Sequence, residues 1–289
     1  MQRLKFINSR GAEAVFDDSG PYIFWKIDGL SLPEVLPIPT RAAGQDGYTL
    51  QELRLESRTV TLTGHIIGVG SRIYSLYEER KRLNSVCNPL LGPGRLVYSN
   101  DYGEWRIPAF CSAMPYEEKI RHAQTLNVEF ECPSPFWLSA TQSVVSLAYV
   151  YGGMSFPIRT PNRFGTLGYR AIISNDSDAE TPLEFLIDGG SLNPVITNTT
   201  TGRFIKLNKQ LFAGDQLYIN TDPEKLEVSH ITTDPETNQR VKSKAYGYLT
   251  HDSELFSLIP GENRLTFKSD DENKKVKITI TFYKRYVGV

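Results

Sequence analysis

Residues 71–96, SRIYSLYEERKRLNSVCNPLLGPGRL, hold the one long helical pattern in this chain. Apolar residues recur at helical spacing on one face, and they are Ile73, Leu76, Tyr77, Leu83, Val86 and Cys87. The opposite face carries Glu78, Glu79, Lys81 and Arg82. Ser71 can cap the first turn through its hydroxyl, and Pro89 cannot continue a helix. The stretch therefore predicts one half-buried helix at about residues 72–87.

Patterns typical of strands surround this helix. Residues 50–67, LQELRLESRTVTLTGHII, alternate apolar and polar side chains, which predicts one half-buried strand. Shorter runs at residues 95–99, 104–108 and 126–132 predict three more. Residues 1–30 contain two aromatic-rich runs on either side of the turn sequence DDSGP, which predicts a hairpin. The helix is therefore expected to cross a β-sheet.

Residues 31–48, SLPEVLPIPTRAAGQDGY, interrupt the strand pattern with three prolines and two glycines. Proline cannot donate to a sheet ladder, so this segment is expected to be an exposed arm or loop. The pair Asp46–Gly47 predicts a turn near its end. Long ordered loops in compact domains tend to carry function, so the segment is a candidate for binding.

The amino-acid pattern changes after the sequence ECPSPFWLSAT, which contains two prolines, and this change predicts a domain boundary near residues 139–143. We expect two domains, residues 1–140 and 141–289. The second has turn signals between short apolar runs, with candidate strands at residues 171–173, 183–187, 194–198, 203–207, 216–220, 226–231, 264–267 and 276–283. This spacing predicts an antiparallel sandwich, with a hairpin turn at residues 270–273.

Composition narrows the function. The chain has 289 residues and a net charge of -1, shared evenly between its halves, so sequence-specific nucleic-acid binding is not expected. The longest apolar run is too short to cross a bilayer, and the first residues do not resemble a secretory signal, so neither membrane insertion nor export is expected. Three distant cysteines, Cys87, Cys111 and Cys132, are expected to be buried free thiols.

Residues for chemistry are sparse. The four histidines lack the spacing of metal ligands, and no nucleotide-binding glycine motif occurs. The run His251–Asp252–Ser253 has the residue types of a hydrolytic triad, but contiguous side chains cannot adopt triad geometry. A weak calcium site at residues 270–272 stays open as a minor alternative. The sequence thus predicts no enzyme, no cofactor and no metal, and it favours binding or assembly.

Several stretches together resemble a known family. In the first half they are FINSRGAEAVF, YIFWKIDGL, GQDGYTLQELRLESRTVTLTGHI, NPLLGPGRLVY and VEFECPSPFW. In the second half they are SNDSDAETPLEFLIDGG, NPVITNTTTGRFIKLN, AGDQLYINT and SELFSLIPGENRLTF. Their order and spacing are similar to those of the distal tail protein family (Dit, or siphovirus tail component) of phages and prophages with long non-contractile tails. The resemblance covers nearly the whole chain and is strongest to short family members.

The resemblance implies a mainly β protein with an N-terminal ring-forming β domain and a C-terminal galectin-like sandwich. It implies a hexameric hub at the virion tail tip, assembled in the bacterial host cytoplasm. The partners implied are the tail tube protein, a tail-tip or fibre (tail-associated) protein and receptor-binding proteins.

A closed ring requires two different patches that meet between neighbours. Residues in the proline-rich segment and in the strand at residues 58–67 suit such contacts, by strand addition to a neighbour's sheet edge or by an arm lying over it. The interface hypothesis names Pro33, Pro37, Pro39, Arg41, Asp46, Arg58, Thr61, Thr63 and His65.

An alternative is that the second domain binds host cell-wall saccharide directly. Sugar sites usually need an exposed aromatic platform, and all three tryptophans lie in the first domain. The remaining candidates are Tyr218, Tyr246, Tyr248 and Phe256.

Overall fold

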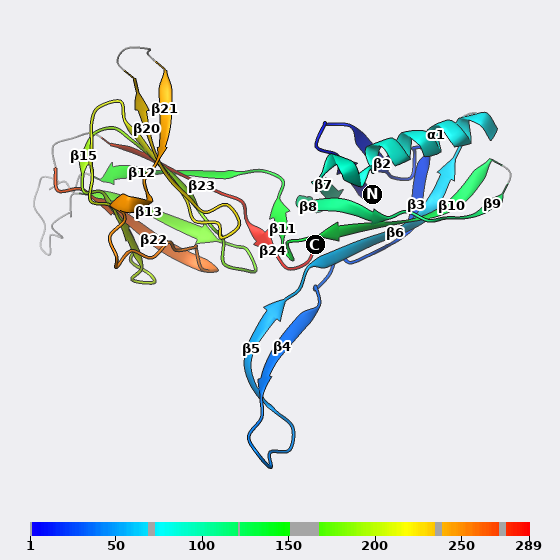
Figure 1. Cartoon of the computed structure of the whole chain (residues 1–289), viewed down its shortest axis with the longest axis horizontal. Helices are drawn as coiled ribbons and strands as arrows, with labels where there is room; N and C mark the ends of the chain where they lie inside the picture. Colours follow the sequence, from blue (N-terminus) through cyan, green and yellow to red (C-terminus); the bar gives the residue numbers. More distant parts are fainter. Residues whose placement is uncertain (1, 69–72, 121, 151–167, 235–238, 272–275) are drawn as a thin grey trace, which may run out of the picture. The chain divides into compact units, whose positions relative to one another are not determined.

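The computed structural model describes residues 2–68, 73–120, 122–150, 168–234, 239–271 and 276–289 (Figure 1). The chain divides into two compact units, Met1–Ala140 with Arg285–Val289, and Thr141–Lys284. The sequence-based boundary assigned residues 285–289 to the second domain. They join the first unit because β24 (Arg285–Tyr286) pairs with β11 (Trp137–Ser139).

The first unit is built on one antiparallel sheet in the strand order β2-β1-β7-β8-β10-β6-β3, with β9 and β11 attached beside this path. The strands are β1 (Arg3–Ile7), β2 (Glu13–Phe16), β3 (Tyr22–Asp28), β6 (Arg58–Ile67), β7 (Gly94–Ser99), β8 (Glu104–Ala113), β9 (Tyr116–Ile120) and β10 (Ala123–Cys132). The sheet is curled, and its two end strands, β2 and β3, lie close together. The ring centroids of Phe16 on β2 and Tyr22 on β3 are 5.6 Å apart. Phe6 and Phe130 pack inside the curl with ring centroids 5.0 Å apart.

The helix predicted at residues 72–87 is confirmed as α1 (Ile73–Val86), followed by the 3-10 turn η2 (Pro89–Leu91). Its expected apolar face is buried at Leu76, Leu83, Val86 and Cys87. Tyr77 was expected on that face, but it is 49% exposed and its hydroxyl accepts a hydrogen bond from Lys119. The proposed cap, Ser71, lies outside the described residues.

A hydrogen bond ties the polar side of α1 to the sheet. The hydroxyl of Tyr22 donates to Oε2 of Glu79 at 2.8 Å. Burial is the main cause of a raised pKa at Tyr22, and the hydrogen bond to the Glu79 carboxylate raises this pKa further. The phenol therefore keeps its proton. Glu79 was expected to face solvent, and it is instead partly covered because β3 supplies this partner.

Two strand predictions in the first domain were wrong, one in which strands pair and one in where a strand ends. Residues 1–30 form a hairpin only from β1 and β2, while β3 pairs with β6. The predicted strand at residues 50–67 is two strands, β5 (Thr49–Leu55) and β6, with a break at residues 56–57. The break separates different surroundings, because β5 is exposed along nearly its whole length and β6 alternates buried with half-buried residues.

Gly64 of β6 tests how closely β3 and β6 approach. A Cβ atom at this position would lie 2.2 Å from the carbonyl oxygen of Ile23. The Gly64→Ala variant is therefore expected to lower the free energy of unfolding by about 1–3 kcal/mol, measured by denaturant titration. Gly247→Ala is the control, because nothing lies within 4 Å of the added atom. Equal stability of the two variants would contradict the expectation.

The second unit is also antiparallel, in the order β17-β16-β22-β13-β12-β23-β14-β19-β20-β21. The strands are β12 (Ser143–Val150), β13 (Gly168–Asn175), β14 (Glu184–Asp188), β16 (Val195–Asn198), β17 (Phe204–Lys206), β19 (Gln216–Asn220), β20 (Glu227–Thr233), β21 (Arg240–Lys244), β22 (Gly261–Lys268) and β23 (Lys277–Phe282). A separate small pair is β15 (Ser191–Leu192) with β18 (Gln210–Leu211), and η3 (Tyr246–Tyr248) is a 3-10 turn.

Both halves of this sheet bury side chains in one core, which makes the unit a sandwich. Phe267 on β22 and Phe185 on β14 belong to the same buried cluster. All eight strands expected from the sequence overlap observed strands, whereas β12, β15, β18 and β21 were not foreseen. Part of the turn expected at residues 270–273 lies outside the described residues. The mainly β fold class, with one α-helix among the described residues, is confirmed.

The three cysteines are free and buried in the first unit, as expected. Burial raises the pKa of Cys132 to about 12, so its thiol is protonated at neutral pH. No helix in the described ranges has the length and apolar character that a membrane span requires.

Candidate assembly interface

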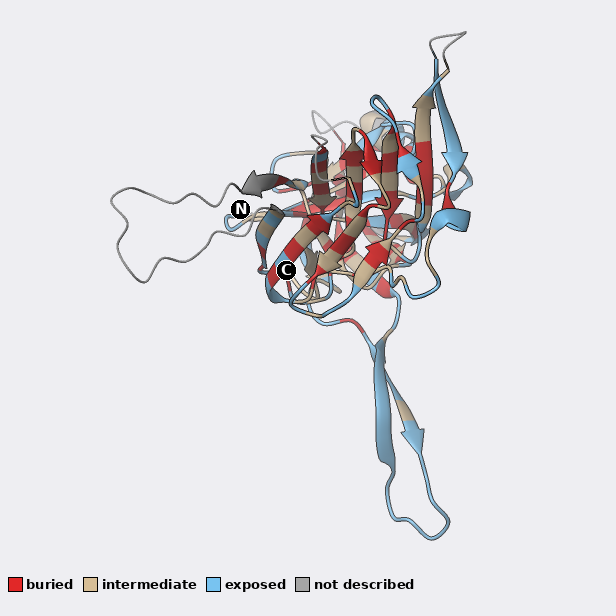
Figure 2. Ribbon diagram, turned by 90° about the vertical axis from the view of Figure 1, so that its left-hand side faces the viewer, coloured by how far each residue is buried: buried red, intermediate tan, exposed pale blue. Residues whose placement is uncertain are grey.

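Residues 35–55 form an arm that has a small sheet of its own. The arm consists of β4 (Val35–Thr40) and β5, which pair only with each other among the described strands. Figure 1 shows this hairpin leaving the curled sheet of the first unit, and Figure 2 shows it exposed along almost all its length. The predicted loop is therefore an ordered ribbon, and proline is tolerated in β4 because that strand has a single partner.

Apolar side chains on and beside the arm face solvent. The exposed ones are Leu32, Val35, Leu36, Tyr48, Leu50 and Leu53, of which Leu53 is 58% exposed. An isolated two-stranded hairpin is at best marginally stable in water. A ribbon with this much uncovered apolar surface is therefore suited to a partner that covers it.

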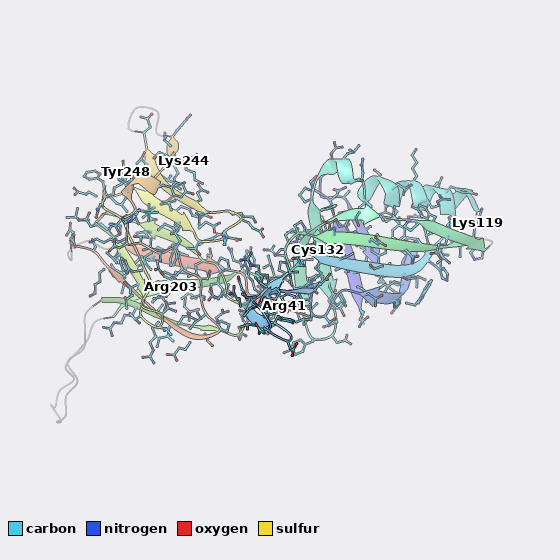
Figure 3. All side chains as sticks on the ribbon, turned by 60° about the horizontal axis from the view of Figure 1, so that its bottom comes forward. Arg41, Lys119, Cys132, Arg203, Lys244 and Tyr248 are labelled. Atoms are coloured by element: carbon cyan, nitrogen blue, oxygen red, sulfur yellow. The ribbon has the colours of Figure 1, made fainter. Side chains whose placement is uncertain are left out.

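Four of the sequence-predicted interface residues lie on the exposed arm. They are Pro37, Pro39, Arg41 and Asp46. Figure 3 labels Arg41 in the arm's turn region, between the ends of β4 and β5. In the same turn the side-chain oxygen of Gln45 accepts the Ala42 amide at 3.0 Å, and Gly44 and Gly47 adopt positive φ angles. Pro33 differs from these four, because it is buried at the root of the arm and is not available to a neighbour.

Thr61, Thr63 and His65 form a second group on one face of β6. All three are half-buried, and Nδ1 of His65 lies 3.3 Å from the hydroxyl of Thr125 on β10. The sequence hypothesis offered β6 for strand addition at a sheet edge. That role is excluded, because β6 is paired on both sides, with β10 and with β3. β6 can therefore contact a neighbour only through its side chains, and the strand at this edge of the sheet is β3.

Trp25 is the residue of this face that sequence reasoning missed. It sits at a register shift in β3, between Phe24 and Lys26, and such a bulge re-aims a side chain. Its ring is 55% exposed and lies 4.3 Å from the ring of His65. A large exposed aromatic beside half-buried polar residues is typical of a binding hot spot. Alternation in the sequence gives no sign of the bulge.

Arg58 was also named as an interface residue, and the structure corrects that assignment. Its side chain is only 2% exposed, and burial lowers its pKa. The guanidinium donates to backbone carbonyl oxygens of Gly29, Ser31, Pro135 and Val287. A side chain whose donors are engaged inside its own unit cannot serve a neighbouring copy.

Comparison with known sequences matches both halves of the chain to phage tail families. Residues 9–132 match the phage tail protein RIFT-related domain, and residues 176–286 match the C-terminal domain of the siphovirus-type tail component. The crystal structure of the SPP1 Dit (gp 19.1) protein aligns with 98% of this chain and 98% of its own, at 12% identity and a TM-score of 0.68. The chain belongs to the siphovirus distal tail protein family.

A second fold likeness comes from a phage baseplate. A chain of the phage P2 baseplate in its activated conformation, solved with calcium and with strontium, matches this distal tail protein over 100% of its length at a TM-score of 0.55 and 12% identity. A search of curated proteins finds no significant match. The sandwich of the second unit agrees with the galectin-like fold that the sequence resemblance implied.

The family is a structural tail component. In this distal tail protein, the serine of the run His251–Asp252–Ser253 has a structural role. The hydroxyl of Ser253, from the run that resembled a triad by composition, donates to the Lys206 carbonyl and accepts the Lys206 amide. Across the described ranges, no three His, Cys, Asp or Glu side chains gather as metal ligands. Residue 272 of the alternative calcium site lies outside those ranges.

The four aromatic residues considered for saccharide binding separate into buried and exposed. Phe256 is in the core and packs on Phe185 at 5.9 Å between ring centroids, while Tyr218 is half-buried under Lys242. Tyr246 and Tyr248 are exposed on η3, and Figure 3 labels Tyr248. Nζ of Lys209 lies 4.0 Å from the Tyr248 ring centroid.

Proposed function

We propose that six copies of this chain form a ring at the distal end of the phage tail. The first units close the ring and join the tail tube protein to the tail-tip or fibre protein, and the second units carry receptor-binding proteins. Assembly takes place in the bacterial host cytoplasm, and the product is the hub at the virion tail tip. The likeness to SPP1 Dit, which is described as a hub adsorption apparatus in phages infecting Gram-positive bacteria, supports this role.

The observation that carries the proposal is the uncovered arm. Its apolar side chains are exposed, and its two strands pair only with each other among the described strands, so by itself it is at best marginally stable and a neighbouring copy would stabilise it by covering it. A closed ring needs two different surfaces on each copy. The arm supplies one, and the face of β3 and β6 around Trp25, Thr61, Thr63 and His65 supplies the other.

The charge of the chain agrees with a ring through which DNA passes. A strongly basic lumen would bind the phosphate backbone and slow its passage. The net charge of -1 brings no such excess.

The solution mass of the full chain tests the proposal directly. Size exclusion coupled to light scattering over a concentration series is expected to give the mass of six chains, with ring-shaped particles in negative-stain images. A chain that is monomeric alone and stays monomeric after mixing with its own tail tube and tail-tip proteins would overturn the proposal.

Replacing Trp25 with alanine is expected to weaken ring formation without unfolding the first unit. The side chain is more than half exposed, so the core loses little, whereas a central interface tryptophan commonly contributes about 2 kcal/mol or more. The expected result is an increase of about 30-fold or more in the concentration at which rings form, measured by light scattering. Tyr102→Ala, at an aromatic that is 92% exposed outside this face, is the control. An equal increase in this concentration for both variants would show that Trp25 is not part of the interface.

Direct saccharide binding by the second unit is the alternative, and Tyr246 and Tyr248 on η3 are the observation in its favour. Exposed tyrosine beside Lys209 would suit an anionic cell-wall glycan. Titration with wall fragments tests it, and saturable binding that Tyr248→Ala abolishes is the supporting result. Absence of binding by the assembled protein would dispose of this alternative.

A further inference from the structure

Arg58 is a buried cation that binds three separate segments of the first unit. Its guanidinium has five N–H donors, and five hydrogen bonds are present. Nε and Nη2 both donate to the carbonyl oxygen of Pro135, at 3.1 Å and 2.9 Å. Nη1 donates to Gly29, at 2.6 Å, and to Ser31, and Nη2 also donates to Val287. Every one of these acceptors is a backbone carbonyl.

The segments joined in this way are the arm root, the segment at Pro135 before β11, and residues 285–289. Gly29 and Ser31 lead from β3 into the arm, and residues 285–289, which we name the C-terminal tail, follow the last crossing from the second unit. Tail and root also touch directly, because the Val289 amide donates to the Leu30 carbonyl at 3.1 Å. A Cβ atom on Gly288 would lie 3.3 Å from the Cα of Ser31. The tail therefore lies along the arm root.

Backbone geometry at the root depends on this arrangement. Gly29 has a φ of +88°, and a Cβ atom there would lie 2.1 Å from the Thr59 carbonyl oxygen. The chain can thus present the Gly29 carbonyl to Arg58 only with glycine at this position. A buried charge that loses an acceptor is costly, so the guanidinium favours the arrangement in which root and tail are both in place.

We propose that Arg58 and the C-terminal tail act together as a brace that fixes the direction in which the arm leaves the first unit. In this role Arg58 is a positioning residue, and the arm rather than Arg58 contacts the neighbour. The inference rests on the proposed function for the arm's purpose, although the brace is a property of the single chain.

The brace also connects the arm to the second unit through the covalent chain. Residue 284 ends the second unit and residue 285 begins the tail. The tail thus leads directly from the second unit to the arm root, and the contacts described along it include the pairing of β24, the Arg58 bond to Val287 and the Val289 bond to Leu30. Attachment of the tail and direction of the arm are thereby coupled.

Spin-label distances test the brace in the intact chain. Labels are placed at Ala43→Cys in the arm's turn and Lys81→Cys on α1, two exposed positions, while the three native cysteines are buried. Labelled protein is diluted into an excess of unlabelled protein, so that only distances within one chain are measured. The unmodified brace is expected to give one narrow distance distribution.

Two changes remove different parts of the brace. Arg58→Lys keeps the charge but cannot reach three segments with one ammonium group. Removing the last three residues, 287–289, deletes the Val287 acceptor and the Val289 donor while leaving β24 and Arg58 in place. Both are expected to lose the narrow peak, and the matched control Arg95→Lys, at an exposed arginine of β7, is expected to keep it.

The outcomes are separable from those of ring formation. A narrow distribution in the shortened chain would overturn the brace, whatever the oligomeric state. If Arg58→Lys fails to fold, as judged by circular dichroism, the shortened chain decides alone. A broad distribution in the shortened chain together with normal rings would support the brace and would place the neighbour's contact as a second means of holding the arm.

Discussion

Shortening the arm to a tight turn is expected to convert the assembled protein into monomers at every accessible concentration. The amide of Glu56 donates to the carbonyl of Glu34 at 3.0 Å, so the two ends of the arm are adjacent. Residues 35–55 can therefore be replaced by two glycines without stretching the chain. The deletion removes both strands of the small sheet and, apart from Leu32, the exposed apolar side chains, which together make up one of the two proposed ring surfaces.

Light scattering of this variant over a concentration series is the measurement. Its circular dichroism should still show a folded β protein that unfolds cooperatively, because almost no residue of the arm is buried in the core of the first unit. A companion variant keeps the hairpin but replaces Leu36, Leu50 and Leu53 with serine, and it should also be monomeric. Rings of normal mass from the shortened protein would show that the arm is dispensable for closure.

Replacing Leu83 with alanine is expected to destabilise the first unit by about 2–5 kcal/mol. Leu83 is fully buried on the face of α1 that packs on the sheet, so its loss leaves a cavity as well as removing apolar contacts. The free energy of unfolding from a denaturant titration, followed by tryptophan fluorescence, measures the effect. All three tryptophans belong to the first unit, so the signal reports that unit alone.

The same chain offers a matched control for this substitution. Leu90, seven residues later in η2, is 92% exposed. Leu90→Ala removes the same atoms from a solvated position, so the free energy of unfolding should change by less than about 0.5 kcal/mol. Similar losses in both variants would mean that α1 does not cover the core as described.

Local sequence patterns were enough to predict the helix and many of the strands. The apolar spacing at Leu76, Leu83 and Val86 specified α1, since a helix that buries one face needs no information from distant residues. Short apolar runs between turn signals likewise located eight strands of the second unit, whereas β12, β15, β18 and β21 were missed. Tyr77 was misplaced because it lies at the margin of the apolar face, where its hydroxyl accepts a hydrogen bond from Lys119.

Pairing between strands could not be read in the same way. β3 joins β6 rather than β2, and this pairing needs the close approach of Ile23 to Gly64, two residues far apart in the sequence. The break at residues 56–57 was hidden because the arm continues the polar and apolar alternation of the core strand. Both features arise from contacts between residues far apart in the sequence.

The candidate interface was predictable in part. Proline in residues 31–48 indicated exposure, and the arm is exposed. Pro33 and Arg58 were assigned to the interface because they belong to the proline-rich segment and to the strand at residues 58–67. Pro33 is buried, and Arg58 is satisfied internally by carbonyl groups that only the folded chain assembles. Trp25 was missed because its exposure follows from a bulge, which depends on how two strands align.

The pairing of β11 with β24 has an evolutionary consequence. Trp137 faces Tyr286, and Leu138 faces Arg285, so the chain leaves the first unit and returns to it on neighbouring strands. A domain can be inserted or exchanged most readily where its two ends meet the host scaffold at adjacent points. Recombination near residues 140 and 285 would therefore exchange the second unit as a whole and leave both flanking strands in the first unit. Such an exchange would keep the sheet, the helix and the arm of the first unit unchanged.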